Sequence, residues 1–139
     1  MGNNIDCSFE KIREIYPRTF LIPSIPSPQH LQVTSNAYIA LLTYNRTSLN
    51  NIFCAPNKIY EYSCFGIPMI GNDIPGLICV VDSNNLGKCA DYNSVESIIE
   101  SLEYVEKNYP NISGECLRFY GEVDMDRIMA SLLEDVENG

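Results

Sequence analysis

Two stretches of the sequence decide the fold: residues 37–44 read AYIALLTY, and residues 56–70 read PNKIYEYSCFGIPMI. The first is a continuous apolar run followed by a polar loop, which is typical of a central strand buried on both faces of a parallel sheet. The second opens with proline and reaches Gly66, which favours a helix over 56–65 and then a strand over 67–70. Strand, helix and strand in this order predict a parallel α/β unit.

The residues before this unit are expected to extend the same pattern. Residues 9–15 resemble a short helix that ends before Pro17, because proline disfavours helical geometry in the residue before it. Residues 19–22, TFLI, predict a short buried strand. Three prolines within 23–28 exclude regular structure there, and Ser27 followed by proline predicts the start of a helix over 28–35.

The residues after the unit continue the alternation of helices and strands. A short helix over 77–81 should follow the turn at 73–76, and Ser94 is expected to cap a long helix that ends near Tyr109. The remaining expected elements are an outer strand over 87–90 and two helices over about 113–120 and 124–137. The predicted fold class is therefore α/β, a Rossmann-like parallel sheet flanked by helices, with residues 1–139 as a single domain.

Composition narrows the class of protein. Hydrophobic residues make up 45% of the 139, which is enough for a packed core. Nine basic residues against 18 acidic ones give a net charge of −9, which argues against a partner with a phosphate backbone. Residues 1–6 lack the basic and apolar regions of a signal peptide, and no apolar stretch reaches the roughly 18 residues of a membrane span. We expect a cytoplasmic protein without a nucleic-acid partner.

The six cysteines are expected to be buried, reduced thiols. None forms a C-x-x-C pair, and several fall within apolar runs such as residues 76–81, GLICVV. Disulfides or metal binding are the alternative. The six positions are Cys7, Cys54, Cys64, Cys79, Cys89 and Cys116.

Ligands of open parallel sheets bind outside the carboxyl ends of the strands, where helix N-termini point amide donors outward. Three loops of the predicted fold lie there: 23–27, 45–55 and 71–76. The second is the most informative, because a helix starting at Pro56 would offer unpaired amides to an anion and Lys58 would add a positive charge.

The run PNKIYEY at 56–62, followed by GIPMI at 66–70, resembles the donor-site signature of GT-B glycosyltransferases of the large retaining family four. The similarity extends over about residues 20–136. It implies that the chain is the C-terminal, donor-binding part of such an enzyme, with a nucleoside diphosphate sugar as donor substrate and no metal or other cofactor. The implied acceptor is a bacterial cell-envelope polysaccharide or a lipid-linked molecule.

The resemblance also implies roles for particular residues. Glu61 matches the glutamate that holds the ribose hydroxyls of the donor nucleotide, and a carboxylate is a strong acceptor for such groups. Cys54, Asn57 and Lys58 fall near the donor sugar and phosphates. The resemblance assigns no catalytic residue in this chain.

Residues Ser24 and Ile25 match the loop that contacts the base through backbone groups. Other family features have no counterpart. Phe53 stands where the family often has a second glutamate, and a phenyl ring accepts no hydrogen bond from a sugar. Nothing before Phe20 matches the arginine and lysine that grip the diphosphate.

These differences predict that the chain is the last part of a longer two-domain enzyme. The acceptor would bind a missing N-terminal domain, the parent enzyme would sit at the inner face of the membrane, and this chain would be inactive by itself.

Two alternatives belong to other functional classes. A receiver-like regulatory module would use Asp73 at a strand end as a phosphorylation site, although an aspartate before a helix more often serves as a cap. A non-catalytic interaction module is the other: a sheet without its first strands would leave an unpaired edge, which predicts self-pairing into a homo-oligomer.

Overall fold

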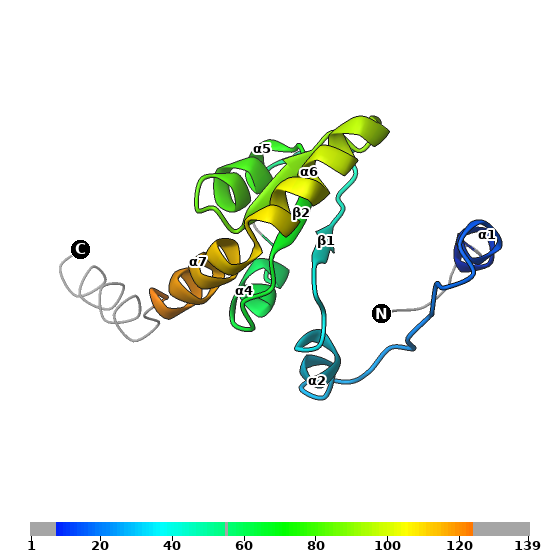
Figure 1. Ribbon diagram of the computed structural model, residues 1–139, viewed down its shortest axis with the longest axis horizontal. Helices are drawn as coiled ribbons and strands as arrows, with labels where there is room; N and C mark the ends of the chain where they lie inside the picture. The colour runs from blue at the N-terminus through cyan, green and yellow to red at the C-terminus, as the bar shows by residue number, and fades with distance from the viewer. Residues whose placement is uncertain (1–7, 55, 124–139) are drawn as a thin grey trace. The chain divides into compact units, whose positions relative to one another are not determined.

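The computed structural model describes residues 8–54 and 56–123, and these divide into two units, within Met1–Asn36 and Ala37–Gly139. The first unit contains helix α1 (Ser8–Ile15) and helix α2 (His30–Thr34) (Figure 1). The helix expected over 9–15 is confirmed. Helix α2 is shorter than the expected helix over 28–35, because residues 27–29 form a turn before it.

The strand expected over residues 19–22 is wrong. These residues adopt no regular structure, and Phe20 is 81% exposed. A strand is stable only when neighbouring strands accept its hydrogen bonds, and the described residues of this unit contain no other strand. Apolar composition alone therefore does not make 19–22 a strand.

The second unit is built on a parallel sheet of three strands, in the order β1 (Ala40–Leu42), β2 (Met69–Asn72) and β3 (Gly87–Ala90). The strands expected over 67–70 and 87–90 are confirmed, with β2 shifted by two residues. All four residues of β2 are buried, as expected for the middle strand. The expectation that 37–44 is the central strand is wrong, because β1 lies at the edge and its Leu41 is exposed.

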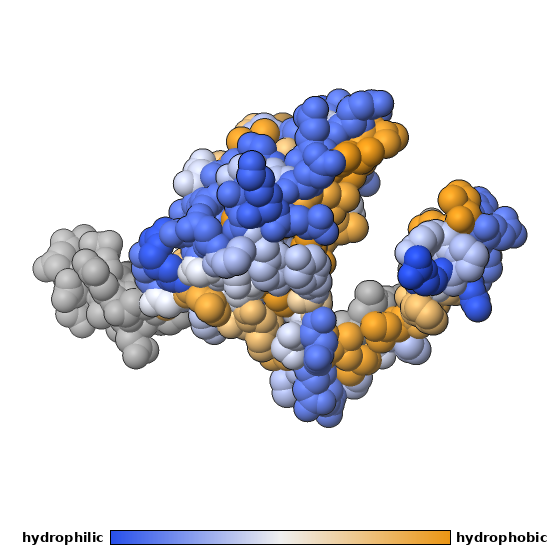
Figure 2. Space-filling view, in the orientation of Figure 1, coloured by the Kyte–Doolittle hydropathy of each residue, from blue (hydrophilic) through white to orange (hydrophobic). Residues whose placement is uncertain are grey.

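Helices cover both faces of the sheet. Helix α6 (Val95–Lys107) packs on the face that carries Ile70, and its outer surface is hydrophilic (Figure 2). The opposite face carries Gly71, which lies against Leu77 of the short helix α5 (Pro75–Leu77). The second unit is thus a mixed α/β structure in which helices flank a small parallel sheet, which confirms the expected class at this level.

The segment between β1 and β2 contains two short helices, α3 (Leu49–Ile52) and α4 (Lys58–Ser63). Helix α3 was not expected within the loop at 45–55. Helix α4 is shorter than the expected helix over 56–65 and ends at Ser63. The turn that follows it reaches Gly66, whose φ of +64° is a conformation that glycine adopts without a steric penalty.

After β2 the chain forms α5, which continues as a π-helical turn, η1 (Ile78–Asp82), in place of the α-helix expected over 77–81. Ser94 caps α6 as expected, since its hydroxyl accepts a hydrogen bond from the amide of Ser97 at 3.1 Å.

Helix α7 (Tyr109–Gly121) starts four residues earlier than expected, because Pro110 is accommodated in its first turn. The helix expected over 124–137 lies outside the described residues.

Among the described residues, the buried hydrophobic core lies within the second unit. Its buried apolar members are Ala40, Leu42, Ile59, Ile67, Met69, Ile70, Ile74, Leu77, Val81, Leu86, Ala90, Val105, Ile112 and Cys116.

The helices within residues 8–54 and 56–123 are all too short or too polar to cross a membrane.

The five cysteines in the described part of the chain are free thiols, as expected. Burial raises the pKa of Cys116 to about 12, so this thiol stays protonated at neutral pH and behaves as a small core residue. The expectation of burial is confirmed for Cys116, whereas Cys54, Cys64 and Cys89 are only half-buried. It is wrong for Cys79, which lies exposed on η1 although its neighbours in the sequence are apolar. Cys7 lies outside the described residues.

Candidate functional site

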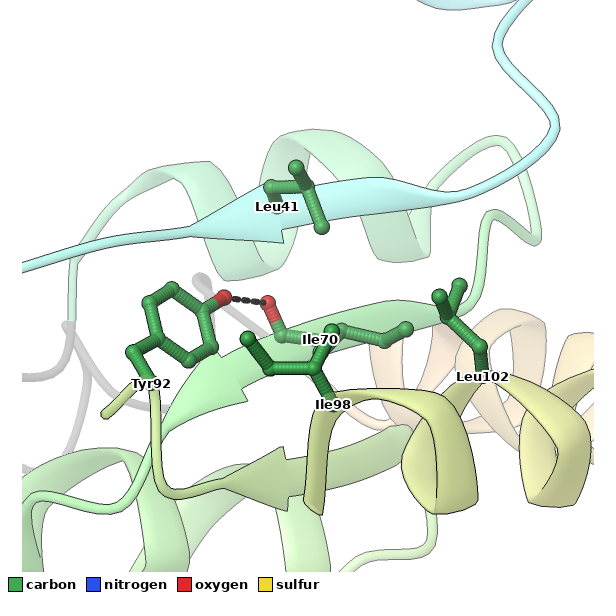
Figure 3. A pocket seen from close by; sticks show the side chains of 5 residues that line it. All are labelled: Leu41, Ile70, Tyr92, Ile98 and Leu102. Carbon is green, nitrogen blue, oxygen red and sulfur yellow. Dashed lines mark hydrogen bonds between the residues drawn. The ribbon is translucent and has the colours of Figure 1, made fainter. Parts of the chain in front are cut away.

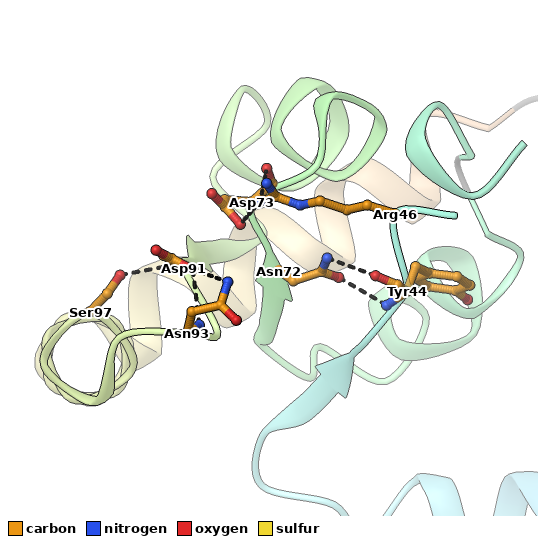
Figure 4. A network of polar contacts seen from close by, with 7 residues as sticks. All are labelled: Tyr44, Arg46, Asn72, Asp73, Asp91, Asn93 and Ser97. Carbon is orange, nitrogen blue, oxygen red and sulfur yellow. Dashed lines mark hydrogen bonds and ion pairs between the residues drawn. The ribbon is translucent and has the colours of Figure 1, made fainter. Parts of the chain in front are cut away.

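The carboxyl end of β1 is held by a side chain of the neighbouring strand. The amide of Asn72, the last residue of β2, donates to the carbonyl oxygen of Tyr44 at 2.9 Å, and its oxygen accepts from the backbone N–H of Tyr44 at 2.9 Å (Figure 4). The side chain therefore replaces the backbone partner that Tyr44 would have in a longer sheet. Because Asn72 is buried, these two bonds fix the point at which the loop after β1 begins.

A second contact joins the loops that follow β1 and β2. The guanidinium of Arg46 forms an ion pair with the carboxylate of Asp73 and also donates to the carbonyl oxygen of Asp73 at 3.3 Å (Figure 4). The interpretation of Asp73 as a helix cap is wrong. Ile74 occupies the cap position of α5, and the Asp73 carboxylate is turned toward Arg46 instead.

The end of the same loop packs against α5. A Cβ atom at Gly76 would lie 2.4 Å from the carbonyl oxygen of Cys54 and 2.7 Å from the carbonyl carbon of Phe53. Both neighbours are backbone atoms, which cannot move without moving the loop. The loop after β1 is therefore anchored near its start, through Tyr44 and Arg46, and near its end, where Phe53 and Cys54 pack against Gly76.

Hydrogen bonds within the loop order it further. The side-chain oxygen of Asn45 accepts from the hydroxyl of Thr47 at 2.7 Å and from the amide of Asn51 at 2.6 Å. The Ser48 hydroxyl caps α3 by accepting from the backbone N–H of Asn51 at 3.2 Å. These hydrogen bonds give the loop that precedes α4 a defined conformation.

Lys58 and Glu61 form a charged pair on α4. The Lys58 ammonium lies 2.6 Å from the Glu61 carboxylate and 5.9 Å from the centre of the Tyr62 ring. Only 14% of the Glu61 side chain is exposed, so it is not an ordinary solvated helix residue. The two charges are held together in a partly sheltered position, where an ion pair is screened less than at an open surface.

Tyr44 completes this cluster. Burial raises the pKa of its hydroxyl, Cys54 raises that pKa further, and Lys58 acts in the opposite direction. Burial also raises the pKa of the Tyr62 hydroxyl, and Glu61 adds to this effect while Lys58 opposes it. Both tyrosines are therefore neutral at physiological pH and can donate and accept hydrogen bonds.

The amide donors expected at the start of α4 are only partly present. The helix begins at Lys58 rather than at Pro56, and the amide of Ile59 already donates to the carbonyl oxygen of Pro56 at 2.9 Å. Asn57 is exposed at the cap position, and its side chain forms no capping hydrogen bond.

Two of the six residues expected to bind the donor, Lys58 and Glu61, therefore form an ion pair beside Tyr62. A third, Cys54, acts together with Lys58 on the pKa of the Tyr44 hydroxyl. Asn57 adjoins them in sequence. Ser24 and Ile25 belong to the first unit, where Ser24 is exposed and Ile25 is partly buried, and their predicted contact with the base stays a prediction.

Sequence reasoning missed Tyr44, Arg46 and Asn72. A signal exists for Asn72, because an amide directly after an apolar run such as MIG at the end of a buried strand requires polar partners. Nothing local marks Tyr44 or Arg46, whose partners lie 28 and 27 residues away.

The end of β3 is capped locally. The Asp91 carboxylate accepts from the backbone N–H of Asn93 at 2.9 Å, and the Asp91 amide donates to the Ser97 hydroxyl at 3.0 Å (Figure 4). These bonds form the turn that leads into α6. The polar side chains at the end of β3 therefore have a structural role, because they hold this turn.

Comparisons with known proteins add no relative: no protein-family model matches the chain, and neither the curated proteins nor the solved structures contain a match. Within residues 8–54 and 56–123, no three histidine, cysteine, aspartate or glutamate side chains are grouped so that they could hold a metal ion.

Proposed function

We propose that this chain is the donor-binding part of a GT-B glycosyltransferase with a Rossmann-like fold. In this proposal the nucleoside diphosphate of a sugar donor binds at α4 and the loop before it, at Tyr44, Cys54, Lys58, Glu61 and Tyr62. The observation that supports this most directly is the sheltered Glu61–Lys58 pair beside an anchored loop at the carboxyl end of a parallel strand. The signature PNKIYEY…GIPMI supplies the family.

Glu61 would accept hydrogen bonds from the ribose hydroxyls. A carboxylate accepts several such bonds, and bonds to a charged group are worth about 1.5–3 kcal/mol each. The donor sugar and phosphates would lie near Lys58, Asn57 and Cys54, where the ammonium offers a compact positive charge.

The parent enzyme would then transfer the sugar to a cell-envelope polysaccharide or a lipid-linked acceptor. Its chemistry would rest on stabilising the departing diphosphate with positive charge and backbone amides. Of these groups the second unit offers Lys58, whose side chain is 43% exposed.

The test is a calorimetric titration of the chain with UDP, GDP and the corresponding 2′-deoxy nucleotides. Wild-type protein should prefer the ribose forms. Glu61→Gln keeps the shape of the side chain but removes its charge, so we expect roughly 10- to 100-fold weaker binding of the ribose nucleotides. The deoxy nucleotides should be affected less.

Glu100→Gln, at an exposed position of α6, is the matched control and should bind as the wild type does. If no nucleotide binds, the proposed function is wrong for this chain. If nucleotides bind with equal affinity to Glu61→Gln, the proposed position of the ribose is wrong.

A further inference from the structure

The outer edge of β1 has no neighbouring strand among the described residues, where the sheet has the order β1-β2-β3. The Ala40 amide donates to the carbonyl oxygen of Pro68 at 2.9 Å, so the backbone groups of Ala40 face β2. Backbone groups alternate in direction along a strand, which turns those of Leu41 outward. This edge therefore presents backbone donors and acceptors to another chain.

The side chain of Leu41 adds an apolar surface beside that edge. It is 64% exposed, although Ala40 and Leu42 on either side of it are buried. It borders a groove of about 230 Å³, whose other lining residues are Ile70, Tyr92, Ile98 and Leu102 (Figure 3). The Tyr92 hydroxyl donates to the carbonyl oxygen of Ile70 at 3.0 Å, so the polar group of the ring is already engaged.

The edge lacks the usual protection against self-pairing. Residues 37–45, AYIALLTYN, contain no charged residue and no proline, in a chain whose net charge is −9. Natural edge strands commonly carry lysine, proline or a bulge, which prevent pairing with a copy of themselves. An identical uncharged strand can pair here without bringing like charges together, which matters because each copy carries a net charge of −9.

We propose that two copies of the chain associate through antiparallel pairing of their β1 strands about a two-fold axis at Leu41. Leu41 of one copy would lie opposite Leu41 of the other, and residue 39 opposite residue 43. The two leucines would share one face of a continuous six-stranded sheet and contact each other beside the two apolar grooves. This proposal does not depend on nucleotide binding.

A stable interface of standard size buries about 1,600 Å² in total, and a three-residue strand with one leucine covers less. We therefore expect a weak dimer that dissociates on dilution. Sedimentation equilibrium over a range of concentrations should show a mass that rises from one chain toward two.

Leu41→Lys should shift this equilibrium toward the monomer by roughly tenfold or more, because it places two ammonium groups opposite each other. The matched control is Leu117→Lys on α7, since Leu117 is 51% exposed, and it should associate as the wild type does. A wild-type chain that is monomeric at every concentration, or a Leu41→Lys chain as dimeric as the wild type, would overturn the proposal.

Cross-linking gives a readout that does not depend on the lysine variant being folded. Opposed residues in antiparallel strands have Cα atoms about 5.5 Å apart, which a disulfide can bridge. In a background with Cys7→Ser and Cys79→Ser, which removes the exposed thiol of the described residues and the cysteine that lies outside them, Leu41→Cys should form a covalent dimer on mild oxidation and Leu117→Cys should not. Equal cross-linking of the two variants, or none of either, would contradict the proposed pairing.

Discussion

The carboxyl end of β1 and the outer edge of the same strand differ in whether their polar groups have partners within the chain. At the carboxyl end, both backbone groups of Tyr44 are bonded to Asn72, and Arg46 is paired with Asp73. At the outer edge, Leu41 is exposed and the described residues provide no further strand.

The carboxyl end of β1 therefore contributes to the stability of the fold, whereas the outer edge is available for contact with another chain. The contacts at the carboxyl end link segments 27 and 28 residues apart, so they position the loop and α4. The outer edge contributes little to the stability of the single chain, since its leucine remains in water. Substitutions at the two places should therefore differ strongly in their effect on folding.

Among the substitutions that probe the carboxyl end and the outer edge of β1, Gly76→Ala should give the largest effect. Its Cβ atom would overlap backbone atoms of Cys54 and Phe53, so the loop or α5 must shift, and we expect a loss of about 3 kcal/mol in the free energy of unfolding. Urea denaturation followed by circular dichroism measures this value.

Gly114→Ala is the control for that experiment. Gly114 lies within α7 and has no atom near the position of an added Cβ, so alanine should stabilise the protein by about 0.5–1 kcal/mol. If the two alanine variants were equally stable, the packing of the loop against α5 would not hold the carboxyl end.

Among the same probes of the two regions, Asn72→Ala should give the next largest effect. It removes two hydrogen bonds and leaves the backbone groups of Tyr44 without these partners, which costs about 2 kcal/mol. Asn111→Ala, at an exposed position of α7, should change the stability by less than about 0.5 kcal/mol. If Asn72→Ala lowered the free energy of unfolding no more than this control does, the hydrogen bonds of Asn72 would not stabilise the carboxyl end of β1.

The smallest effect is expected from Leu41→Ala. Leu41 is exposed, so its truncation should cost less than about 1 kcal/mol when unfolding is measured at low protein concentration. The adjacent Leu42→Ala should cost about 2–5 kcal/mol, because Leu42 is 3% exposed and its truncation leaves a cavity. Similar losses for the two neighbours would mean that the outer edge is covered in the folded chain.

The sequence predicts those elements whose local signals agree with their surroundings. Ser94 caps the amphipathic helix where expected, and the apolar strand that follows Gly66 is present, shifted by two residues. Residues 19–22 and 37–44 carry an equally apolar signal, but the first forms no strand and the second only a short edge strand. An apolar run indicates that burial is favourable, and it does not indicate whether a neighbouring strand is present.

The candidate site was predictable in part for the same reason. Lys58 and Glu61 are three residues apart, so a helix places them on one face whatever the rest of the fold does. The contacts of Asn72 with Tyr44 and of Arg46 with Asp73 follow only from the register of two parallel strands. Spacing along the chain carries no information on that register.

The most direct test of the proposed donor site is a two-dimensional NMR titration of the isotope-labelled chain with UDP and GDP. We expect one of these nucleotides to shift the backbone amide signals of Tyr44, Lys58 and Glu61 along one saturable curve, with little change along α7. Shifts confined to residues outside the loop and α4, or no shifts with either nucleotide, would contradict the assignment of this cluster as a nucleotide site.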